Sequence, residues 1–178
     1  MISIQKIKEL IESKPRGFFK GIIPVNFGGL SVDTEKLKKI ANENNLWIIE
    51  DASHSPGSYF FDSKGLKNMS GNCKFSDLTV FSFHPVKHIA CGEGGMITTN
   101  NQDLYKKLCL LRSHGIERNV KQQNNQGWYY DILNLGFNYR LTDFQAALGL
   151  SQLKKNIAGV KKRNSIATVS YTHLRAHE

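Results

Sequence analysis

The chain has 178 residues, of which 40% are hydrophobic and 22% are charged, as expected for one ordinary globular domain with a core. Its formal net charge of +9 raises the question of nucleic-acid binding. The last 28 residues hold +5 of that charge, and the preceding 150 residues hold only +4. Because the chain has neither a basic face interleaved with aromatic residues nor a known binding motif, we expect no nucleic-acid partner.

The cysteines and the N-terminal residues indicate the compartment. Cys73, Cys91 and Cys109 are odd in number and show no Cys-x-x-Cys spacing, which favours a reducing environment over a disulfide framework. The N-terminus lacks the basic and then apolar pattern of a signal peptide, and no apolar run reaches membrane-spanning length. These features predict a cytoplasmic protein with no membrane partner.

Helix and strand patterns alternate along the first hundred residues. Apolar residues at helical spacing predict a helix over residues 4–13, and Asp33-Thr34 cap a second helix that ends at Asn44. Residues 57–76 predict a surface turn or hairpin. Short apolar runs predict strands over 21–27, 46–50, 78–82 and 95–99. Such alternation implies a layered α/β domain with a largely parallel sheet.

Two more helices are predicted in the second half of the chain. Asn100 or Asn101 caps the first helix, and Gly115 ends it. Thr142 caps the second helix, whose apolar stripe consists of Phe144, Ala147, Leu148 and Leu150. The polar residues 117–131 between them predict a long loop that carries function or contacts a partner.

The last eleven residues, 168–178, differ from the sequence before them. They show neither helical nor strand periodicity, and Tyr171–Glu178 resembles a peptide translated from a sequencing adapter. We therefore interpret 168–178 as a non-native tail that carries no function. A native terminus is the alternative.

Lys87 lies in a loop of small and polar residues that follows the predicted strand 78–82. A lysine amine becomes reactive when it is desolvated or placed near other cations, and a loop at a strand end suits that purpose. Asp51 follows the strand 46–50, where its carboxylate is expected at the ligand edge of the sheet. Taken alone, Asp51 is better explained as a helix cap and Lys87 as a surface charge. Together they meet two needs of pyridoxal phosphate (PLP), an amine for its aldehyde and an acid for its pyridine nitrogen.

Two further residues fit this interpretation. Ser82, at the end of its strand, offers a hydroxyl to the phosphate of the cofactor, or alternatively a bond to the backbone. His54, three residues after Asp51, either reaches the cofactor ring and its phenolic oxygen or packs beneath the loop.

Glycines and possible metal ligands follow the same strands. The glycines after Lys87 allow sharp turns but do not match a dinucleotide-binding fingerprint. No metal is predicted, because the candidate ligands have no recognised spacing: His54, His84, His88 and Cys91.

Five segments occur in the order found in one known family. The combination resembles the DegT-type sugar-nucleotide aminotransferases, which have the PLP-dependent fold type I, and the resemblance extends from about Gly21 to Ala167. The segments are Glu50–His54, Phe81–Lys87, Gly92–Gly95, Arg112–Gly115 and Gly136–Gly149. Within the family, Arg112–Ile116 and Leu148–Leu153 favour the branch of UDP-4-amino-4,6-dideoxy-N-acetyl-beta-L-altrosamine transaminases, which serve pseudaminic acid biosynthesis.

The resemblance implies a role for each matching position. It implies that Lys87 forms the Schiff base and shuttles protons, and that Asp51 pairs with the pyridine nitrogen. His54 is implied near the ring oxygen, and Ser82 at the phosphate. Asn138 is implied to reach the cofactor phosphate of a second subunit, so that the active site is shared across a homodimer. Arg140 and His84 are weaker candidates for substrate or interface contacts.

The resemblance also implies a fold, a reaction and an incomplete active site. The fold is a three-layer α/β large domain with a mostly parallel sheet, of which residues 1–167 form the central part. The reaction transfers the amino group of L-glutamate to a UDP-linked 4-keto-6-deoxy sugar. Family members continue beyond this segment at both ends, so we expect the segment alone to be inactive. Alternatives are a related aminotransferase for another keto sugar and a non-catalytic regulatory relative.

Overall fold

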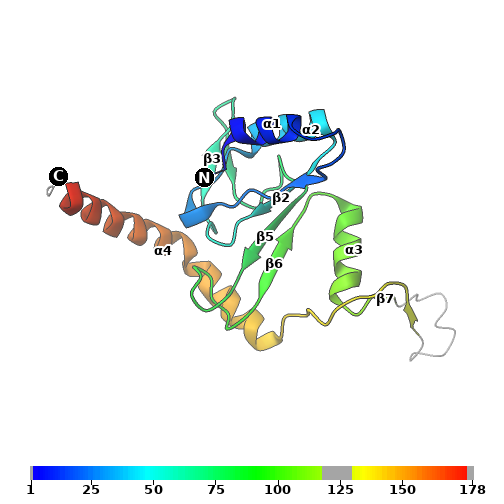
Figure 1. Cartoon of the computed structure of the whole chain (residues 1–178). Coiled ribbons are helices and arrows are strands. Elements are labelled where there is room, and N and C mark those ends of the chain that lie inside the picture. The colour runs from blue at the N-terminus through cyan, green and yellow to red at the C-terminus, as the bar shows by residue number, and fades with distance from the viewer. Residues whose placement is uncertain (1, 118–129, 176–178) are drawn as a thin grey trace.

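The computed structural model describes residues 2–117 and 130–175 of the chain. Its main sheet has four strands in the order β1-β2-β5-β6 (Figure 1). β1, β2 and β5 run parallel, and β6 is antiparallel to β5. The strands are β1 Gly21–Ile22, β2 Trp47–Asp51, β5 Leu78–Ser82 and β6 Gly95–Thr98. This arrangement confirms the predicted α/β fold with a mostly parallel sheet.

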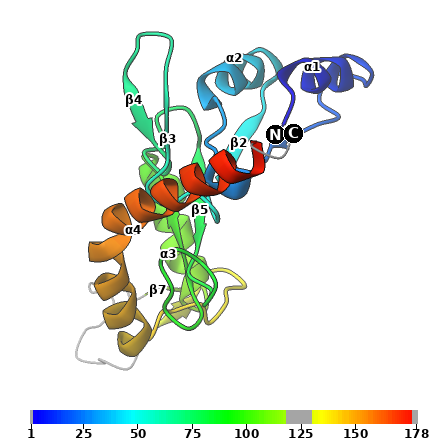
Figure 2. The same cartoon turned by 90° about the vertical axis from the view of Figure 1, so that its left-hand side faces the viewer.

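The described part of the chain contains four α-helices. α1 and α2 lie together at one end, α3 lies beside β6, and α4 extends away from the body of the molecule (Figures 1 and 2). Each begins close to its predicted position, and Asp33, Asn101 and Thr142 accept bonds from helical N–H groups as the predicted caps. The helices are α1 Ile4–Glu12, α2 Thr34–Asn44, α3 Gln102–Arg112 and α4 Asp143–Arg175.

The main hydrophobic core lies between α2 and the strands β1 and β2. Leu37 and Ala41 on α2 and Ile48 on β2 are fully buried there, and apolar residues of α1 pack against them. The predicted inward face of α2 is therefore confirmed. Because burial of a leucine- or isoleucine-sized side chain contributes about 1.5–3 kcal/mol, this cluster is the main stabilising element of the part of the chain before β5.

The first strand is shorter than predicted. β1 ends at Ile22, whereas the prediction extended to residue 27. Pro24 has no N–H to donate, so its ladder position contributes only a carbonyl, which accepts from the Asp51 amide at 2.9 Å. The chain then turns through Phe27–Gly29, where Gly28 adopts a positive φ of 64°.

Residues 57–76 contain a small hairpin, as predicted. β3 (Tyr59–Phe61) and β4 (Lys67–Met69) pair antiparallel and project from the main sheet (Figure 2). Asp62 organises the turn, since its carboxylate accepts bonds from the Leu66 amide at 2.9 Å and the Lys74 ammonium at 2.7 Å.

The second half of the chain is more open. Gly115 has a φ of +70° where the chain leaves α3, as predicted for a helix stop, and β7 (Ile116–Glu117) pairs with β8 (Asp131–Ile132). Most of the predicted loop 117–131 lies outside the described residues. The helix α4 continues to Arg175, although residues 168–175 lack an evident helical pattern.

The apolar stripe predicted on α4 is not buried within this chain. Phe144 is 91% exposed, and Leu148 and Leu150 are exposed as well. α4 contacts the body of the molecule through a different residue, because buried Asn156 donates from Nδ2 to the Pro56 carbonyl at 3.1 Å. The stripe therefore has the helical spacing that the sequence predicts but no partner surface among the described residues.

Candidate active site

Two of the predicted site residues lie at the ends of neighbouring parallel strands. Asp51 is the last residue of β2, and Ser82 is the last residue of β5. Asp51 aligns with Val80 in the strand register, so Ser82 extends two residues further along the same edge. Both side chains are half-buried. The carboxyl ends of adjacent parallel strands are the usual ligand edge of an open α/β sheet, and Asp51 and Ser82 both lie at that edge.

The segment after β2 is held by backbone hydrogen bonds on both sides. The Asp51 carbonyl accepts from the Asn26 amide and the Ala52 amide donates to the Val80 carbonyl, each at 2.9 Å. The Asp51 carboxylate accepts from the Ser53 amide at 3.0 Å, which fixes its direction locally. Asp51 is therefore a loop-ordering residue as well as a candidate ligand.

His54 lies half-buried between two segments. Its Nδ1 accepts a 3.4 Å bond from the Gly28 amide, and its ring is 5.5 Å from the ring of Phe27. The packing role considered for His54 is thus present in the structure. The Nε2 side of the ring remains the side from which it can act on a ligand.

The loop that carries Lys87 folds back on itself after β5. The Phe83 amide donates to the Gly94 carbonyl at 2.8 Å, the Cys91 amide donates to the Phe83 carbonyl at 3.0 Å, and the Lys87 amide donates to the His84 carbonyl at 2.9 Å. Gly94 has a φ of +153° at the return of the loop, as the glycine pattern predicts. Lys87 is consequently half-buried rather than freely solvated.

His88 shows that positive charges gather around this loop, a feature that the sequence analysis missed. Burial lowers the pKa of His88, and the charges of Arg163, His54 and Lys87 lower it further. Its Nδ1 is buried and has no hydrogen-bond partner among the residues that the structure describes. The position of His88 beside Lys87 was the available signal, whereas its approach to Arg163 on α4 depends on tertiary structure.

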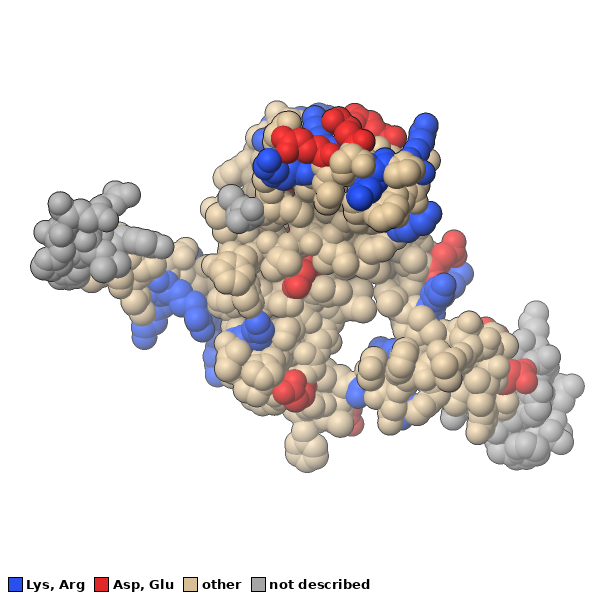
Figure 3. Space-filling model, viewed as in Figure 1, with Lys and Arg blue, Asp and Glu red and all other residues tan. Residues whose placement is uncertain are grey.

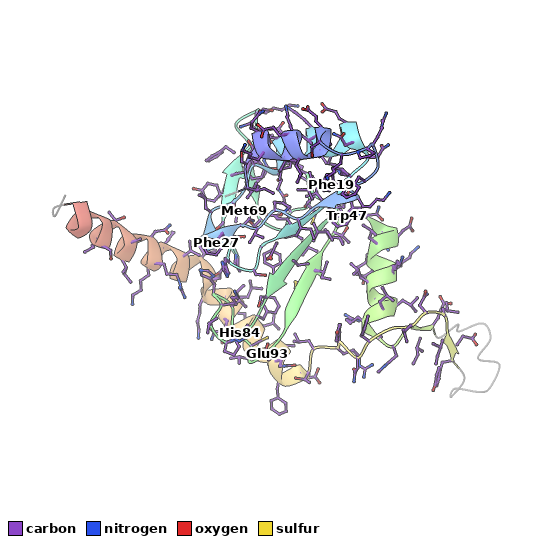
Figure 4. The ribbon with its side chains drawn as sticks, viewed as in Figure 1. Phe19, Phe27, Trp47, Met69, His84 and Glu93 are labelled. Carbon is purple, nitrogen blue, oxygen red and sulfur yellow. The ribbon has the colours of Figure 1, made fainter. Side chains whose placement is uncertain are left out.

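His84 lies on the outside of the same loop, at the lower edge of the molecule beside Glu93 (Figure 4). Its Nε2 is 3.8 Å from the Glu93 carboxylate, and its Nδ1 accepts from the Val86 amide at 3.3 Å. The exposed side chain therefore organises the loop surface and stays accessible to a ligand or a second chain.

Asn138 and Arg140 lie in a different part of the chain, after β8. Asn138 is exposed and pairs through its backbone with Ser113 at the end of α3. Arg140 lines a hollow of about 980 Å³ between β6 and α3, together with apolar residues such as Met96 and Leu141. An opening is visible in Figure 3 between the body of the molecule and the arm that carries β7. The hollow also includes Glu93 and Gly94, so Arg140 lies near the end of the loop that holds Lys87.

Metal and membrane features were also sought in the described parts of the chain. No three His, Cys, Asp or Glu residues within them lie close enough together to hold a metal ion. None of the described helices is long and apolar enough to span a membrane.

The chain folds into an α/β domain in which Asp51 and Ser82 end neighbouring parallel strands and Lys87 lies half-buried in the loop after Ser82. Comparison with known sequences gives the family. The chain belongs to the DegT/DnrJ/EryC1/StrS aminotransferase family, whose pattern matches residues 1–178. The resemblance seen in the sequence is therefore confirmed.

Two sequence relatives illustrate the match. The uncharacterized protein MJ1066 of Methanocaldococcus jannaschii is 38% identical over 170 residues, which are 94% of this chain and 41% of that protein. A UDP-4-amino-4,6-dideoxy-N-acetyl-beta-L-altrosamine transaminase of Campylobacter jejuni is 44% identical over 144 residues, 81% of this chain and 35% of that protein. The chain thus spans well under half the length of these relatives.

Solved structures agree with the fold. An aminotransferase of the same family from Brucella abortus superposes with a TM-score of 0.79 at 29% identity, covering 98% of this chain and 43% of its own. PseC of Helicobacter pylori, involved in pseudaminic acid biosynthesis, gives 0.72 at 32% identity over 87% of this chain and 37% of its own. The putative sugar aminotransferase Spr1654 of Streptococcus pneumoniae, solved in a PLP-form, gives 0.73 at 25% identity over 90% and 42%.

Proposed function

We propose that the chain forms the central part of the large domain of a PLP-dependent sugar-nucleotide aminotransferase, with Lys87 as its reactive amine. One observation carries the proposal. In a chain that belongs to an aminotransferase family, Asp51 and Ser82 end adjacent parallel strands, and the loop after Ser82 holds Lys87 half-buried. Solved relatives in PLP and PMP forms support the choice of cofactor.

The residues at the strand edge fit the chemistry of this cofactor. When bound, PLP supplies an electron sink that accepts the electron pair left at carbon after proton removal. Asp51 would hold the proton on the pyridine nitrogen, and Ser82 would donate a hydrogen bond to the phosphate. The positive charges of Lys87 and Arg163 near His88, whose buried Nδ1 has no hydrogen-bond partner in the described part of the chain, fit an anionic group nearby.

Lys87 would bind the cofactor and then move a proton between the substrate carbon and its own amine. His54 would orient the cofactor ring through its free ring edge. In the overall reaction the donor gives up its amino group and its Cα hydrogen and gains a carbonyl oxygen from water, while the carbonyl oxygen of the acceptor leaves as water. The acceptor carbon changes from a ketone to an amine, so that atoms and electrons balance with no external oxidant.

For the substrates, we propose L-glutamate as donor and a UDP-linked 4-keto-6-deoxy sugar as acceptor, which leads toward pseudaminic acid-type glycans. The altrosamine transaminases of Campylobacter jejuni and Helicobacter pylori, at 44% and 37% identity, support this choice. Another keto sugar is the second candidate, because the spore coat polysaccharide protein SpsC of Bacillus subtilis is 36% identical. Product analysis with several 3-keto and 4-keto sugar nucleotides separates the two.

The proposal extends to a second subunit. Asn138 is exposed, as suits a residue that serves the cofactor phosphate of a partner in a homodimer. Exposed Arg140 and His84 are proposed to contact the substrate or the partner.

Recovery of the complete reading frame is the direct check on the proposed domain boundary at residue 167 and on the non-native tail. Cytoplasmic localisation stays a prediction.

The test is an activity assay of the longer protein that contains this chain. We expect Lys87→Ala to abolish amino transfer, because Lys87 is the only lysine of the loop 83–94. Lys64→Ala, which changes an exposed lysine of the hairpin turn, is the matched control and should retain full activity. Full activity in Lys87→Ala would refute the assignment. A wild-type protein that binds no PLP would favour the regulatory alternative.

A further inference from the structure

We propose that Asn26 and Glu50, joined to Thr79, are positioning residues that hold Asp51 at the cofactor edge of the sheet. The proposal rests on the proposed function of Asp51. Asn26 lies within the predicted strand 21–27 and Glu50 begins the segment Glu50–His54, but the sequence analysis predicted no role for either side chain. The three side chains form a buried polar network beneath the site, and all are at most 6% exposed.

Asn26 connects three segments of the chain. Its Nδ2 donates to the Glu50 carboxyl group at 2.7 Å and to the Ser55 hydroxyl at 3.0 Å, and it lies 3.2 Å from the Ser70 hydroxyl. Its Oδ1 accepts from the Val32 amide at 2.9 Å. Because both ends of the amide are hydrogen-bonded, the nitrogen as donor and the oxygen as acceptor, its orientation is fixed.

The backbone of Asn26 adds the link to Asp51. Its N–H donates to the Asp51 carbonyl at 2.9 Å, while its side chain holds Glu50, the residue before, and Ser55, four residues after. One asparagine therefore fixes the strand end and the following turn, which carry Asp51 and His54.

Glu50 completes the link to the neighbouring strand. Its second carboxyl oxygen accepts from the Thr79 hydroxyl of β5 at 2.9 Å. Successive side chains of a strand point to opposite faces, so Glu50 faces away from the side that Asp51 presents. Glu50 can thus act on a ligand of Asp51 only through the backbone, which makes it a positioning residue and not a binding residue.

The energetics favour a rigid network. A buried carboxyl group is costly unless its hydrogen bonds are satisfied, and both oxygens of Glu50 have a donor here. Loss of one member leaves the others unpaired in a low-dielectric interior, so the chain there must shift or admit water. A shift at this point moves Asp51 directly, since the two residues are adjacent in β2.

The hairpin offers a matched control. Asn68 is buried and donates from Nδ2 to the buried Asp62 carboxylate at 3.1 Å, the same pair of chemical groups outside the strand edge. If buried amide–carboxyl pairs only stabilise the fold, Asn26→Ala and Asn68→Ala should have the same consequences.

The experiment measures PLP affinity and amide hydrogen exchange in the longer protein. We expect Asn26→Ala to weaken PLP binding by about tenfold or more, the range seen when residues that orient a ligand are lost. In the apo-protein, exchange at Ser53 and Ser55 should accelerate. Asn68→Ala should change PLP affinity less than about twofold. Thr79→Val, which removes the hydroxyl, should weaken PLP binding, whereas Thr79→Ser, which keeps it, should bind PLP like the wild type. This milder pair of variants tests the proposal even if Asn26→Ala does not fold.

A double-mutant cycle separates this proposal from the proposed function. If Asn26 acts through Asp51, the effect of Asn26→Ala on PLP affinity should disappear in the Asp51→Ala background. Equal losses from Asn26→Ala and Asn68→Ala, or additive losses with Asp51→Ala, would overturn the positioning role and leave Asp51 as a ligand. Unchanged PLP affinity in Asp51→Ala alone would overturn both proposals.

Discussion

The two halves of the chain differ in how they bury their apolar residues. Before the Lys87 loop, α2 and β2 enclose a core in which Leu37 and Ile48 are fully buried. After Cys91, no apolar side chain is buried among the described residues. The charged residues also differ, because both signs gather over α1 and α2 while much of the face below is uncharged (Figure 3).

This difference indicates where the candidate site gets its rigidity. Asp51 and Ser82 end strands of the packed half, and the network of Asn26, Glu50 and Thr79 lies there too. The open half supplies Asn138, Arg140 and an uncovered α4. The packed half can thus hold chemical groups in place by itself, whereas the open half has apolar surface to offer to further protein.

Core truncation should show the largest contrast. We expect Leu37→Ala to lower the free energy of unfolding of this chain by about 2–5 kcal/mol, because it leaves a cavity in the packed half. Phe144→Ala, at a 91% exposed position, should change it by less than about 0.5 kcal/mol. Denaturant unfolding measures both. Equal losses of unfolding free energy in the two variants would contradict the difference between the packed and the open half. If Phe144→Ala is strongly destabilising only in the longer protein, α4 is covered there.

The contact of α4 with the packed half should depend on Asn156. Asn156→Ala removes the donor to the buried Pro56 carbonyl and should cost about 1–3 kcal/mol. Ser165→Ala on the exposed part of α4 is the control and should be nearly neutral. Hydrogen exchange at Ser58 reports the loss of the contact. Unchanged exchange in Asn156→Ala would mean that α4 is held elsewhere.

Acid should weaken the hairpin of the packed half in a defined direction. The bonded Lys74 ammonium holds the pKa of Asp62 well below its usual range, despite burial, which acts in the opposite sense. The ionised carboxylate therefore stabilises the fold above its unfolded pKa of about 3.9, and this stabilisation is lost as the pH falls from there toward the native pKa. Stability curves of wild type and Asp62→Asn should differ at pH 7 and converge in acid. A constant difference would exclude this linkage.

The smallest effect concerns the charge that α4 brings to the site. Burial is the main cause that lowers the pKa of His88, and Arg163 is the next. Arg163→Gln should therefore raise the pKa of His88 toward its ordinary value, as followed by NMR titration of the ring. Lys161→Gln, at an exposed neighbouring position, should leave it unchanged. No change in Arg163→Gln would place α4 farther from the Lys87 loop.

Much of the packed half could be predicted from the sequence, because local patterns determine it. The capping residue Asp33 and the spacing of Leu37, Ile40 and Ala41 specify α2, and short apolar runs specify β2 and β5. The early end of β1 was missed, although Pro24 was a visible reason for it. The position of Asp51 near the end of β5 was predictable, because the sequence predicts a parallel sheet.

The contacts between distant parts of the chain could not be predicted from the sequence. Asn26 bonds to Glu50, which lies 24 residues later in the sequence, and Arg163 lies near His88 at a larger sequence separation. No local sequence pattern predicts either contact. The stripe of α4 was correct in spacing, but its exposure depends on what lies opposite. Asn138 was assigned only through the family resemblance, and its role stays a prediction.

The central claim is that Lys87 is the amine that binds the cofactor at the edge formed by β2 and β5. Borohydride reduction of the PLP-loaded longer protein, followed by peptide mass spectrometry, tests it directly. We expect the reduced cofactor on the peptide that contains Lys87, and no labelled peptide in Lys87→Ala. A label on another lysine of the wild-type protein, with Lys87 unmodified, would contradict the account.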